Sequence, residues 1–267
     1  MTTTAPSATR VELVLRQADY WRTVYRRTWK GSVITSFVQP LFYVAAMGLL
    51  LGDYIDDGGA ALEGAPSYLA FIAPGLLAAQ AMQIASGETL WPVMGAVKWN
   101  KTYHGMIATP LRVSDVIAAH LLFVLFRIAS SCAVFALVLA PFDVYSSVGG
   151  ALVAYLASVL VGMAFAAPIY AFAAGATTEQ WFAFIMRLIV MPLFLFSGAF
   201  FPIGNLDPWM EGLARITPLW HGVDLARMAT LGNLDGSAVL GHVAYLVLLC
   251  AVGCWWAGRR LTRRLVT

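Results

Sequence analysis

Charged side chains are scarce along this chain of 267 residues. They make up 12% of it, while apolar residues make up 60%; soluble domains average roughly 25% charged and about 45–50% apolar residues. A soluble fold of this size cannot bury so much apolar surface. The composition therefore excludes a soluble enzyme and a disordered chain. It predicts an all-α polytopic membrane protein, whose helices each need about 20 apolar residues to cross the bilayer.

Cysteine and histidine are too few and too scattered to build a disulfide framework or a metal site. The three cysteines, Cys132, Cys250 and Cys254, fall in long apolar runs, where a thiol usually behaves as a small buried hydrophobe. The four histidines show no ligand spacing. We therefore expect no bound metal.

Motifs for nucleotide and peptide chemistry are also missing. A phosphate-binding loop needs Gly-Lys followed by Ser or Thr, and the chain has no Gly-Lys pair. The His-Glu-x-x-His motif of zinc proteases is absent as well. We expect no catalytic residue and no cofactor in this chain, so any ATP that drives it must bind to another subunit.

Six apolar runs are long enough to be membrane spans, at 31–52, 67–91, 114–140, 148–174, 180–201 and 238–258. Lysine and arginine concentrate in 1–30, 92–112 and 259–267, whereas the loop 53–66 carries only acidic charges. The positive-inside rule places both termini and the 92–112 loop in the cytoplasm. The net charge of +3 is therefore a topology signal and does not indicate nucleic acid binding.

The chain divides into three parts on this basis. Residues 1–30 form a polar tail and an amphipathic helix, 31–258 a six-span domain, and 259–267 a basic cytoplasmic tail. In the helix, Trp21, Tyr25 and Trp29 share one face and basic residues occupy the other. This pattern predicts a helix in the membrane interface with its rings at the headgroups; the alternative is an ordinary surface helix.

The loop at 97–110 is too polar to span and has a patterned sequence. Trp99, Tyr103 and Met106 are spaced to share one face of a short helix, with Lys98 and Lys101 on the other side. An exposed aromatic stripe with basic flanks is typical of a site that docks another protein. A helix lying on lipid headgroups fits the same residues, and the pattern alone leaves both open.

A second segment follows the fifth apolar run. Pro202 and Gly204 end that helix, and the pairs Asp207-Pro208 and Thr217-Pro218 are start signals for two short helices, at 208–216 and 218–230. Neither is long enough to cross the membrane. We expect re-entrant or interfacial helices that form an outer gate, with an ordinary amphipathic loop as the alternative.

Three ionisable residues fall inside the predicted spans: Glu88, Arg127 and Arg187. A charge at the bilayer centre costs at least about 2.5–3.5 kcal/mol, so these groups must pair, reach the interface or line a polar cleft. An ion pair or a helix cap involving Glu88 is one interpretation. Direct contact with a polar substrate headgroup is the other.

The two patterned segments carry a family resemblance. The run from Glu88 through Lys101-Thr102-Tyr103 and Ile107-Ala108-Thr109-Pro110-Leu111 to Asp115-Val116-Ile117, and the run Ser197-Gly198-Ala199-Phe200-Phe201-Pro202-Ile203, resemble the ABC-2 type transport permeases. These are membrane subunits of bacterial ABC exporters. Within the family the chain is similar to permeases of lipo-oligosaccharide (nodulation-factor) export and of drug export.

The resemblance implies a permease in the bacterial cytoplasmic membrane that exports a lipid, a glycolipid or a hydrophobic drug. It implies two copies of an ABC ATPase subunit that hold MgATP, and a second permease chain in a homo- or heterodimer. The loop after span 2 would be the coupling helix. An ion-coupled transporter or channel acting without an ATPase is the competing class.

The resemblance and the pattern together assign residues to four roles. ATPase coupling falls to Lys98, Trp99, Lys101, Tyr103, His104 and Met106. The substrate pathway would include Phe37, Tyr43, Glu88, Arg127, Arg187, Phe194 and Phe200. The outer gate would include Ser197, Gly198, Phe201, Pro202 and Trp209. Gly48 and Gly52 have the spacing for close helix approach and would contact the second permease.

Overall fold

The computed structural model describes residues 9–57 and 62–266, and every regular element within them is helical. The first eight residues of the predicted polar tail lie outside this range. The elements are α1 (Arg10–Tyr43), η1 (Val44–Leu50), α2 (Leu51–Asp57), α3 (Tyr68–Met94), η2 (Gly95–Trp99), α4 (Thr102–Ile107), α5 (Val113–Leu139), η3 (Ala140–Phe142), α6 (Val148–Gly175), α7 (Gln180–Ile185), η4 (Met186–Val190), α8 (Met191–Phe196), η5 (Ile203–Asn205), α9 (Pro208–Ile216), α10 (Pro218–Leu231) and α11 (Gly236–Leu265).

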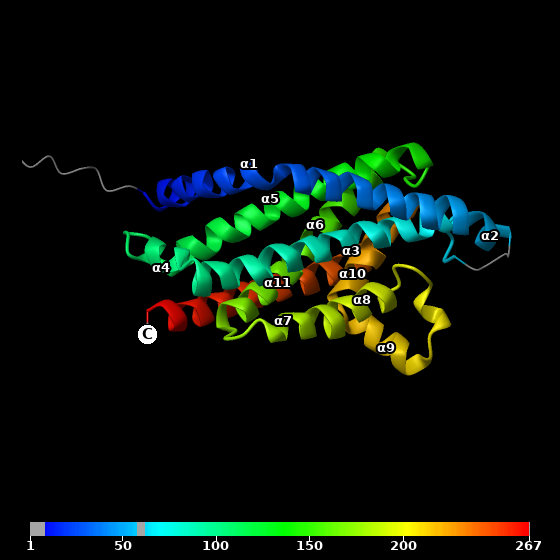
Figure 1. The fold of residues 1–267 in the computed structure, drawn as a ribbon. Coiled ribbons are helices and arrows are strands. Elements are labelled where there is room, and N and C mark those ends of the chain that lie inside the picture. Colours follow the sequence, from blue (N-terminus) through cyan, green and yellow to red (C-terminus); the bar gives the residue numbers. More distant parts are fainter. Residues whose placement is uncertain (1–8, 58–61, 267) are drawn as a thin grey trace, which may run out of the picture.

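The long helices run side by side in an elongated bundle (Figure 1). The start of α1, the short α4 and the end of α11 lie at one end, which we call the inner end. Helices α2 and α9 lie at the opposite, outer end. The structure thus brings the three basic segments to the same end, as the charge distribution predicted.

Among the described residues, four helices are long and apolar enough to cross a membrane: Tyr68–Trp99, Val113–Phe142, Val148–Gly175 and Gly236–Leu265. A fifth candidate combines Glu12–Gly31 with Ser36–Gly48, which meet at a bend of 54°. The prediction of six spans is therefore confirmed for four helices, and for a fifth if the bent pair counts as one span.

The predicted span 180–201 is shorter than expected. Its helix runs from Gln180 to Phe196, because the chain turns away from helical geometry at Ser197 and Gly198. At about 1.5 Å per residue, these residues reach a little less than the roughly 30 Å of a bilayer core.

The aromatic face of α1 packs on α5. The Trp21 ring is buried and stacks on Phe123 with 4.7 Å between centroids, and Tyr25 meets Phe126 edge-on at 5.3 Å. Trp29 is exposed. The expectation that all three rings lie among headgroups is corrected for Trp21, whose ring is covered by protein.

Helices α3 and α6 form the centre of the bundle. Within its apolar stretch α3 is 83% buried, whereas α11 is 17% buried and lies at the periphery. Helix α6 packs against α3, α5, α10 and α11. At Gly222 of α10, an added Cβ would fall 1.8 Å from Cγ2 of Val161, so only glycine lets α10 approach α6 this closely.

The two short outer helices form where the sequence predicted them. Pro208 and Pro218 occupy the first turns of α9 and α10. The Thr217 side chain caps α10 by accepting a hydrogen bond from the Trp220 amide at 3.3 Å. The Asp207 side chain makes no such cap on α9, and only its backbone oxygen accepts from that helix.

Candidate functional site

The segment between α3 and α5 presents a short helix at the inner end. Helix η2 continues α3 as far as Trp99, and the chain turns at Lys101, whose φ of +50° lies in the left-handed region that is uncommon for residues with a side chain. This turn sends α4 off in a new direction. Lys98, Trp99, Lys101 and His104 are all exposed to the surroundings.

Tyr103 anchors this helix from beneath. Its side chain is 1% exposed and its hydroxyl bonds both His120 Nδ1 on α5 and, at 3.1 Å, the Tyr170 hydroxyl on α6. His120 Nε2 lies 3.1 Å from the Glu88 backbone oxygen. Because that oxygen can only accept, Nε2 carries the proton and Nδ1 accepts from Tyr103.

The chain of hydrogen bonds therefore runs from Tyr170 through Tyr103 and His120 to α3. We call these three side chains the tyrosine–histidine network. It joins α4 to three long helices, and Trp21 of α1 lies against His120 with 4.3 Å between ring centroids. Burial raises the pKa of Tyr103 well above its ordinary value, so the hydroxyl stays neutral.

The predicted aromatic stripe is not formed as expected. Tyr103 is buried, so its side chain positions α4 and does not belong to an exposed stripe. Met106 is half-buried. Trp99 is 50% exposed and lies at the end of η2, where its ring stacks beside Trp91 at 6.3 Å.

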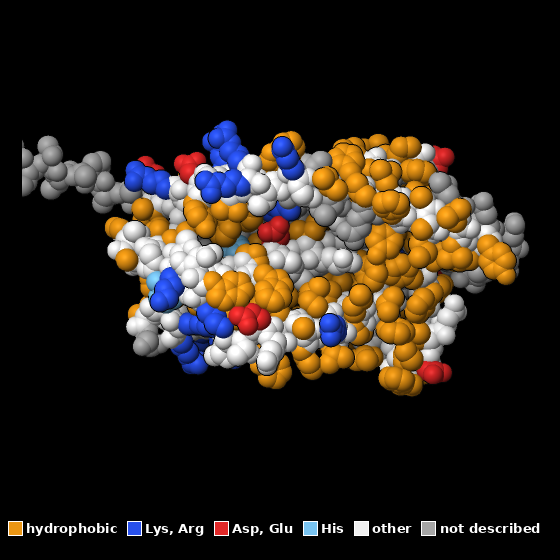
Figure 2. All heavy atoms as spheres, viewed as in Figure 1, with side chains coloured by type: hydrophobic (Ala, Val, Ile, Leu, Met, Phe, Trp, Pro, Cys, Tyr) orange, Lys and Arg blue, Asp and Glu red, His pale blue; other side chains and the backbone are white. Residues whose placement is uncertain are grey.

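Basic side chains gather around this segment (Figure 2). Lys98 pairs with Glu179 at 3.2 Å, and both side chains are more than a third exposed. A hydrogen bond from its own backbone amide, and then the bond from Lys98, hold the pKa of Glu179 below its ordinary value. In the basic tail, Arg264 donates to the carbonyls of Ala174 and Ala176 and so covers the end of α6.

Glu88 and Arg127 form an ion pair of 2.8 Å between α3 and α5. Their side chains are 23% and 12% exposed, and the Arg127 guanidinium lies over the Tyr25 ring. The pair explains how two charges are accommodated inside the bundle. Arg187, in η4, has an exposed side chain and does not join them.

Three of the four aromatic residues predicted for the pathway lie together. The Phe194 ring is 6.2 Å from that of Tyr43 and 4.9 Å from that of Phe200. These contacts link α1, α8 and the gate segment. Phe37 is 45% exposed on a part of α1 outside this group.

The gate segment 197–202 crosses the outer end as an irregular strip. Gly198 has a φ of +81°, a conformation that favours glycine, and Ser197 and Pro202 are buried. Phe201 is half-buried beside Phe196. Trp209, on α9, is 69% exposed.

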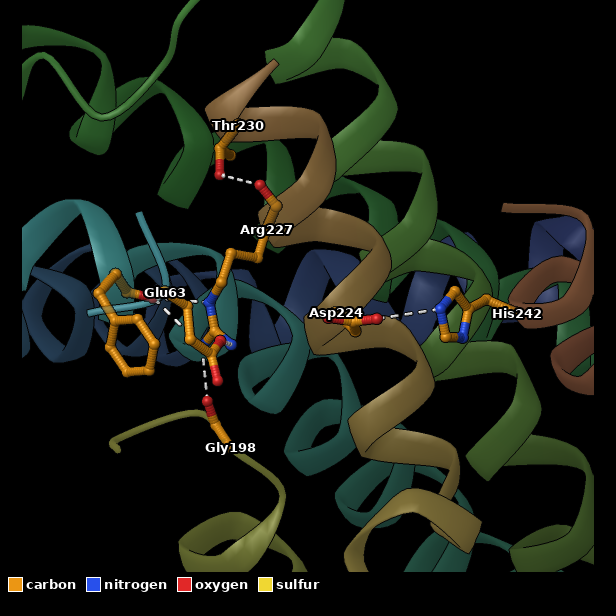
Figure 3. Close-up of polar contacts among 7 residues, drawn as sticks. Glu63, Gly198, Asp224, Arg227, Thr230 and His242 are labelled. Atoms are coloured by element: carbon orange, nitrogen blue, oxygen red, sulfur yellow. Dashed lines mark hydrogen bonds and ion pairs between the residues drawn. The ribbon is translucent and has the colours of Figure 1, made fainter. Parts of the chain in front are cut away.

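Arg227 of α10 clamps this strip to the rest of the outer end (Figure 3). The side chain is 7% exposed and pairs with Glu63 at 2.9 Å. Its Nη2 donates to the Gly198 oxygen at 2.5 Å, and both Nε and Nη2 lie 3.4 Å from the Phe71 oxygen. One guanidinium therefore ties α10, α3, the gate segment and the acidic loop together.

Sequence reasoning missed this clamp. Glu63 was used only as part of the acidic loop that indicates topology, and Arg227 was placed in a helix predicted to be interfacial. A usable signal was present: Arg227 is a lone arginine among the small and apolar residues of 225–231. A single cation in such a stretch needs a partner, and the loop 53–66 carries only acidic charged residues.

Gly48 and Gly52 do not present an open face. A Cβ added at Gly48 would fall 2.8 Å from the Leu69 side chain of α3, so this glycine permits close packing within its own subunit. Gly52 is also buried. The contact of these glycines with a second permease stays a prediction.

Residues 9–57 and 62–266 contain no group of three or more His, Cys, Asp or Glu side chains that could hold a metal ion. Within this range Cys132 is buried, and Cys250 and Cys254 are half-buried.

Comparisons with known proteins extend these observations. Residues 17–231 match the family model of the ABC-2 type transporter. Nodulation protein J of Rhizobium leguminosarum bv. trifolii is 30% identical over 255 residues, which cover 92% of this chain and 94% of that protein. Nodulation protein J of Neorhizobium galegae is 28% identical over 91% of this chain and 94% of its own length. The inner membrane transport permease YadH of Escherichia coli is 24% identical over 86% of this chain and 88% of its own length.

The family match includes α4, the tyrosine–histidine network, the gate segment and the Arg227 clamp, and the resemblance read from the sequence is confirmed. This chain belongs to the ABC-2 type transporter family.

Proposed function

We propose that the chain is the permease subunit of an ATP-driven exporter, and that it moves an amphipathic substrate outward across the cytoplasmic membrane. The family match over residues 17–231 carries this proposal. Two kinds of relative support it, one named for nodulation and one named as an inner membrane permease. A lipid, a glycolipid or a hydrophobic drug would suit an apolar bundle with few fixed polar groups.

The proposed topology has six crossings with both termini in the cytoplasm. Helices α3, α5, α6 and α11 supply four of them. The bent α1 segment with η1 and α2, and the helix Gln180–Phe196, would supply the other two. Exposed apolar residues on both segments support this, among them Phe42 on α1 and Leu188 and Met191 on the shorter helix. The same surfaces would contact lipid and a second permease chain.

The inner end would dock the ATPase subunits. Trp99 offers an exposed apolar contact, and Lys98, Lys101 and His104 surround it with donors and positive charge. An aromatic anchor with a polar rim is the usual anatomy of a protein–protein hot spot. Two ATPase copies would hold MgATP between them, and this chain would supply no nucleotide ligand.

The proposed mechanism is alternating access driven from the inner end. Closure of the ATPase subunits on ATP would displace α4. Because the tyrosine–histidine network ties α4 to α3, α5 and α6, these helices would move with it. The aromatic group of Tyr43, Phe194 and Phe200 would line the route, and the gate segment would open at the outer leaflet.

Substitution of Trp99 by Asp tests the coupling step. The permease would be reconstituted with its ABC ATPase subunit, and substrate-stimulated ATP hydrolysis would be measured. We expect Trp99→Asp to abolish the stimulation while the protein still inserts, and Trp99→Phe, which keeps an aromatic ring, to retain most of it. Full stimulation in Trp99→Asp would reject the docking role.

The purified chain alone in liposomes tests the competing class. An ion-coupled carrier or a channel would support gradient-driven flux without any ATPase. We expect no flux from the permease alone and ATP-dependent flux once the partner is added. Flux through the chain by itself would overturn the proposed function.

A further inference from the structure

A polar hollow of about 750 Å³ lies at the outer end between α9, α10 and α11. Its size is within the range of ligand pockets, about 300–1,000 Å³. The chemistry of its lining is unusual for an apolar bundle, since it combines carboxylates, guanidiniums, imidazoles and aromatic rings. The side chains concerned are Glu63, Glu211, Arg215, Trp220, His221, Asp224, Arg227, His242 and Tyr245.

Each of the three carboxylates in this hollow has a nitrogen donor beside it. Glu211 pairs with Arg215 at 2.5 Å. The other two contacts join Glu63 to Arg227 at 2.9 Å and Asp224 Oδ2 to His242 Nε2 at 3.1 Å (Figure 3). Each arginine already has a carboxylate, so the lining offers no surplus cation to a phosphate. Paired groups still present many donors and acceptors, which suits an uncharged ligand rich in hydroxyl or amide groups.

The two histidines are joined to each other and to Asp224. His242 Nε2 donates to Asp224 Oδ2, and His242 Nδ1 lies 2.7 Å from His221 Nδ1. Nε2 of His221 adds a further hydrogen-bonding group to the hollow. The Tyr245 ring stacks on His221 with 4.0 Å between centroids, and Trp220 lies 5.0 Å from it. Such rings offer apolar faces beside the hydrogen-bonding groups.

An apolar groove of about 290 Å³ lies between α9 and the helix Gln180–Phe196. The one hydroxyl in its lining, on Thr217, already donates to the Ala214 oxygen at 2.7 Å. Apart from the indole N–H of Trp209, the side chains of this lining offer no polar group to a ligand. The lining residues are Leu188, Ile189, Pro192, Leu193, Phe196, Trp209, Met210, Leu213, Ala214 and Thr217.

Helix α9 separates the two spaces and contributes to both. Glu211 and Arg215, one turn apart, line the polar hollow, whereas Trp209, Met210 and Leu213 line the groove. A ligand that uses both spaces must therefore have a polar part and an apolar part joined across one short helix.

We propose that the polar hollow and the apolar groove form one bipartite site for an amphiphile. Its uncharged, hydrogen-bonding headgroup binds between α10 and α11, and its hydrocarbon chain lies in the groove on the other side of α9. This inference rests on the proposed function, since it places a binding step of the exported substrate at the outer gate. It adds a location and a preference for an uncharged headgroup over an anionic one.

Photoaffinity labelling tests the arrangement. The full-length permease in nanodiscs, without nucleotide or ATPase, would be labelled with two alkyl maltosides that carry a diazirine either on the sugar or at the end of the chain. We expect the sugar probe to label peptides within 218–245 and the chain probe to label 188–196 and 209–214. Labelling of one common region by both probes, or labelling only of helices outside these segments, would overturn the proposal.

Two variants and a competitor make the test quantitative. Asp224→Asn should weaken labelling by the sugar probe about tenfold, the loss expected when a hydrogen bond to a charged group is removed. Leu213→Gln should weaken labelling by the chain probe, and Asp143→Asn should change neither, because Asp143 is exposed in the turn between α5 and α6 with a φ of +52° that Asn also tolerates. An alkyl phosphate that competes as well as the maltoside would reject the preference for an uncharged headgroup.

The outcome for this site is separable from that for the proposed function. Labelling needs no ATP, so it can succeed even if ATP-dependent export fails. That result would reject the exporter proposal and support the site. Conversely, ATP-dependent export without labelling at α9, α10 and α11 would reject only the site.

Discussion

The inner and outer ends of the bundle handle polar groups in opposite ways. At the inner end the buried tyrosine–histidine network is neutral, the buried Asp115 carboxylate caps its own helix, and the charges of Lys98, Lys101 and Glu179 are exposed. At the outer end a charge is buried between helices: Arg227 is 7% exposed and holds Glu63 and two backbone carbonyls. Figure 2 shows the surface counterpart, with Lys and Arg toward the inner end and apolar side chains over the outer half of that face.

The difference indicates what each end contacts. An exposed charge costs little free energy in water and raises the specificity and rate of protein association. This fits the proposal that the inner end docks a cytosolic partner. Buried charge is costly unless it is paired. At the outer end the buried Arg227 holds the gate segment, which has little regular structure, in place. The same type of interaction, a carboxylate with a cation, should therefore be weak where the cation is exposed, as at Lys98, and strong where it is buried, as at Arg227.

Substitution of Arg227 by Met should have the largest effect. It keeps much of the side-chain volume but leaves Glu63 and the oxygens of Gly198 and Phe71 without their shared donor. We expect a loss of about 1–3 kcal/mol for each of the two backbone oxygens that lose their donor, because Glu63 is 37% exposed and can be hydrated, and we expect proteolytic cleavage near 197–206. Thermal unfolding in nanodiscs and limited proteolysis would measure both.

Arg215→Met is the matched control at the same end. Arg215 pairs with Glu211 but is 58% exposed, so its removal should cost at most about 1 kcal/mol. If both arginine variants lost the same stability, burial would not distinguish the two pairs and the comparison between the ends would fail.

Tyr103→Phe should have the second largest effect, at the inner end. The ring still fills its buried site, but His120 and Tyr170 lose the hydroxyl between them. An unsatisfied buried polar group costs about 1–3 kcal/mol. We expect faster hydrogen exchange in 102–107 and weaker coupling of ATP hydrolysis to transport. Unchanged exchange in α4 would show that the hydroxyl does not hold this helix.

Glu88→Gln should have a smaller effect. The variant keeps an oxygen that can accept from Arg127, and both side chains are partly exposed, so we expect a loss of about 1 kcal/mol. Transport assays at equal protein amounts would then separate two roles. A transport defect larger than the stability defect would support contact with substrate, and normal transport would remove Glu88 from the pathway.

The sequence was sufficient to predict features that depend on local rules. The helix starts at Pro208 and Pro218 and the clustering of basic segments at one end follow from capping and charge counts. The helix predicted to reach residue 201 instead ends at Phe196. The Glu88–Arg127 pair was one of two stated interpretations, because an apolar helix offers a charge few alternatives.

The remaining features depend on which face of a helix meets which neighbour. Tyr103 was assigned to a docking stripe by its spacing to Trp99, but spacing cannot show that the chain turns at Lys101 and carries Tyr103 inward. Gly48 fits a helix–helix contact, and the sequence does not say whether the neighbour is α3 or another subunit. The Arg227 clamp joins residues 164 positions apart, beyond the reach of any local pattern.

The smallest effect is expected at the exposed pair of Lys98 and Glu179, and it sharpens the comparison most directly. Glu179→Gln should leave the thermal midpoint at neutral pH within the error of the measurement, since solvent and salt screen the pair. The pKa of Glu179 is lowered in the folded state, so its small contribution is present above the ordinary value of 4.5 and is lost as the pH falls through the folded value. Wild type and Glu179→Gln should therefore converge in acid, in low salt as well as in high salt. A large midpoint shift at neutral pH would mean that the inner end also depends on a charge pair for its stability, and the contrast with Arg227 would not hold.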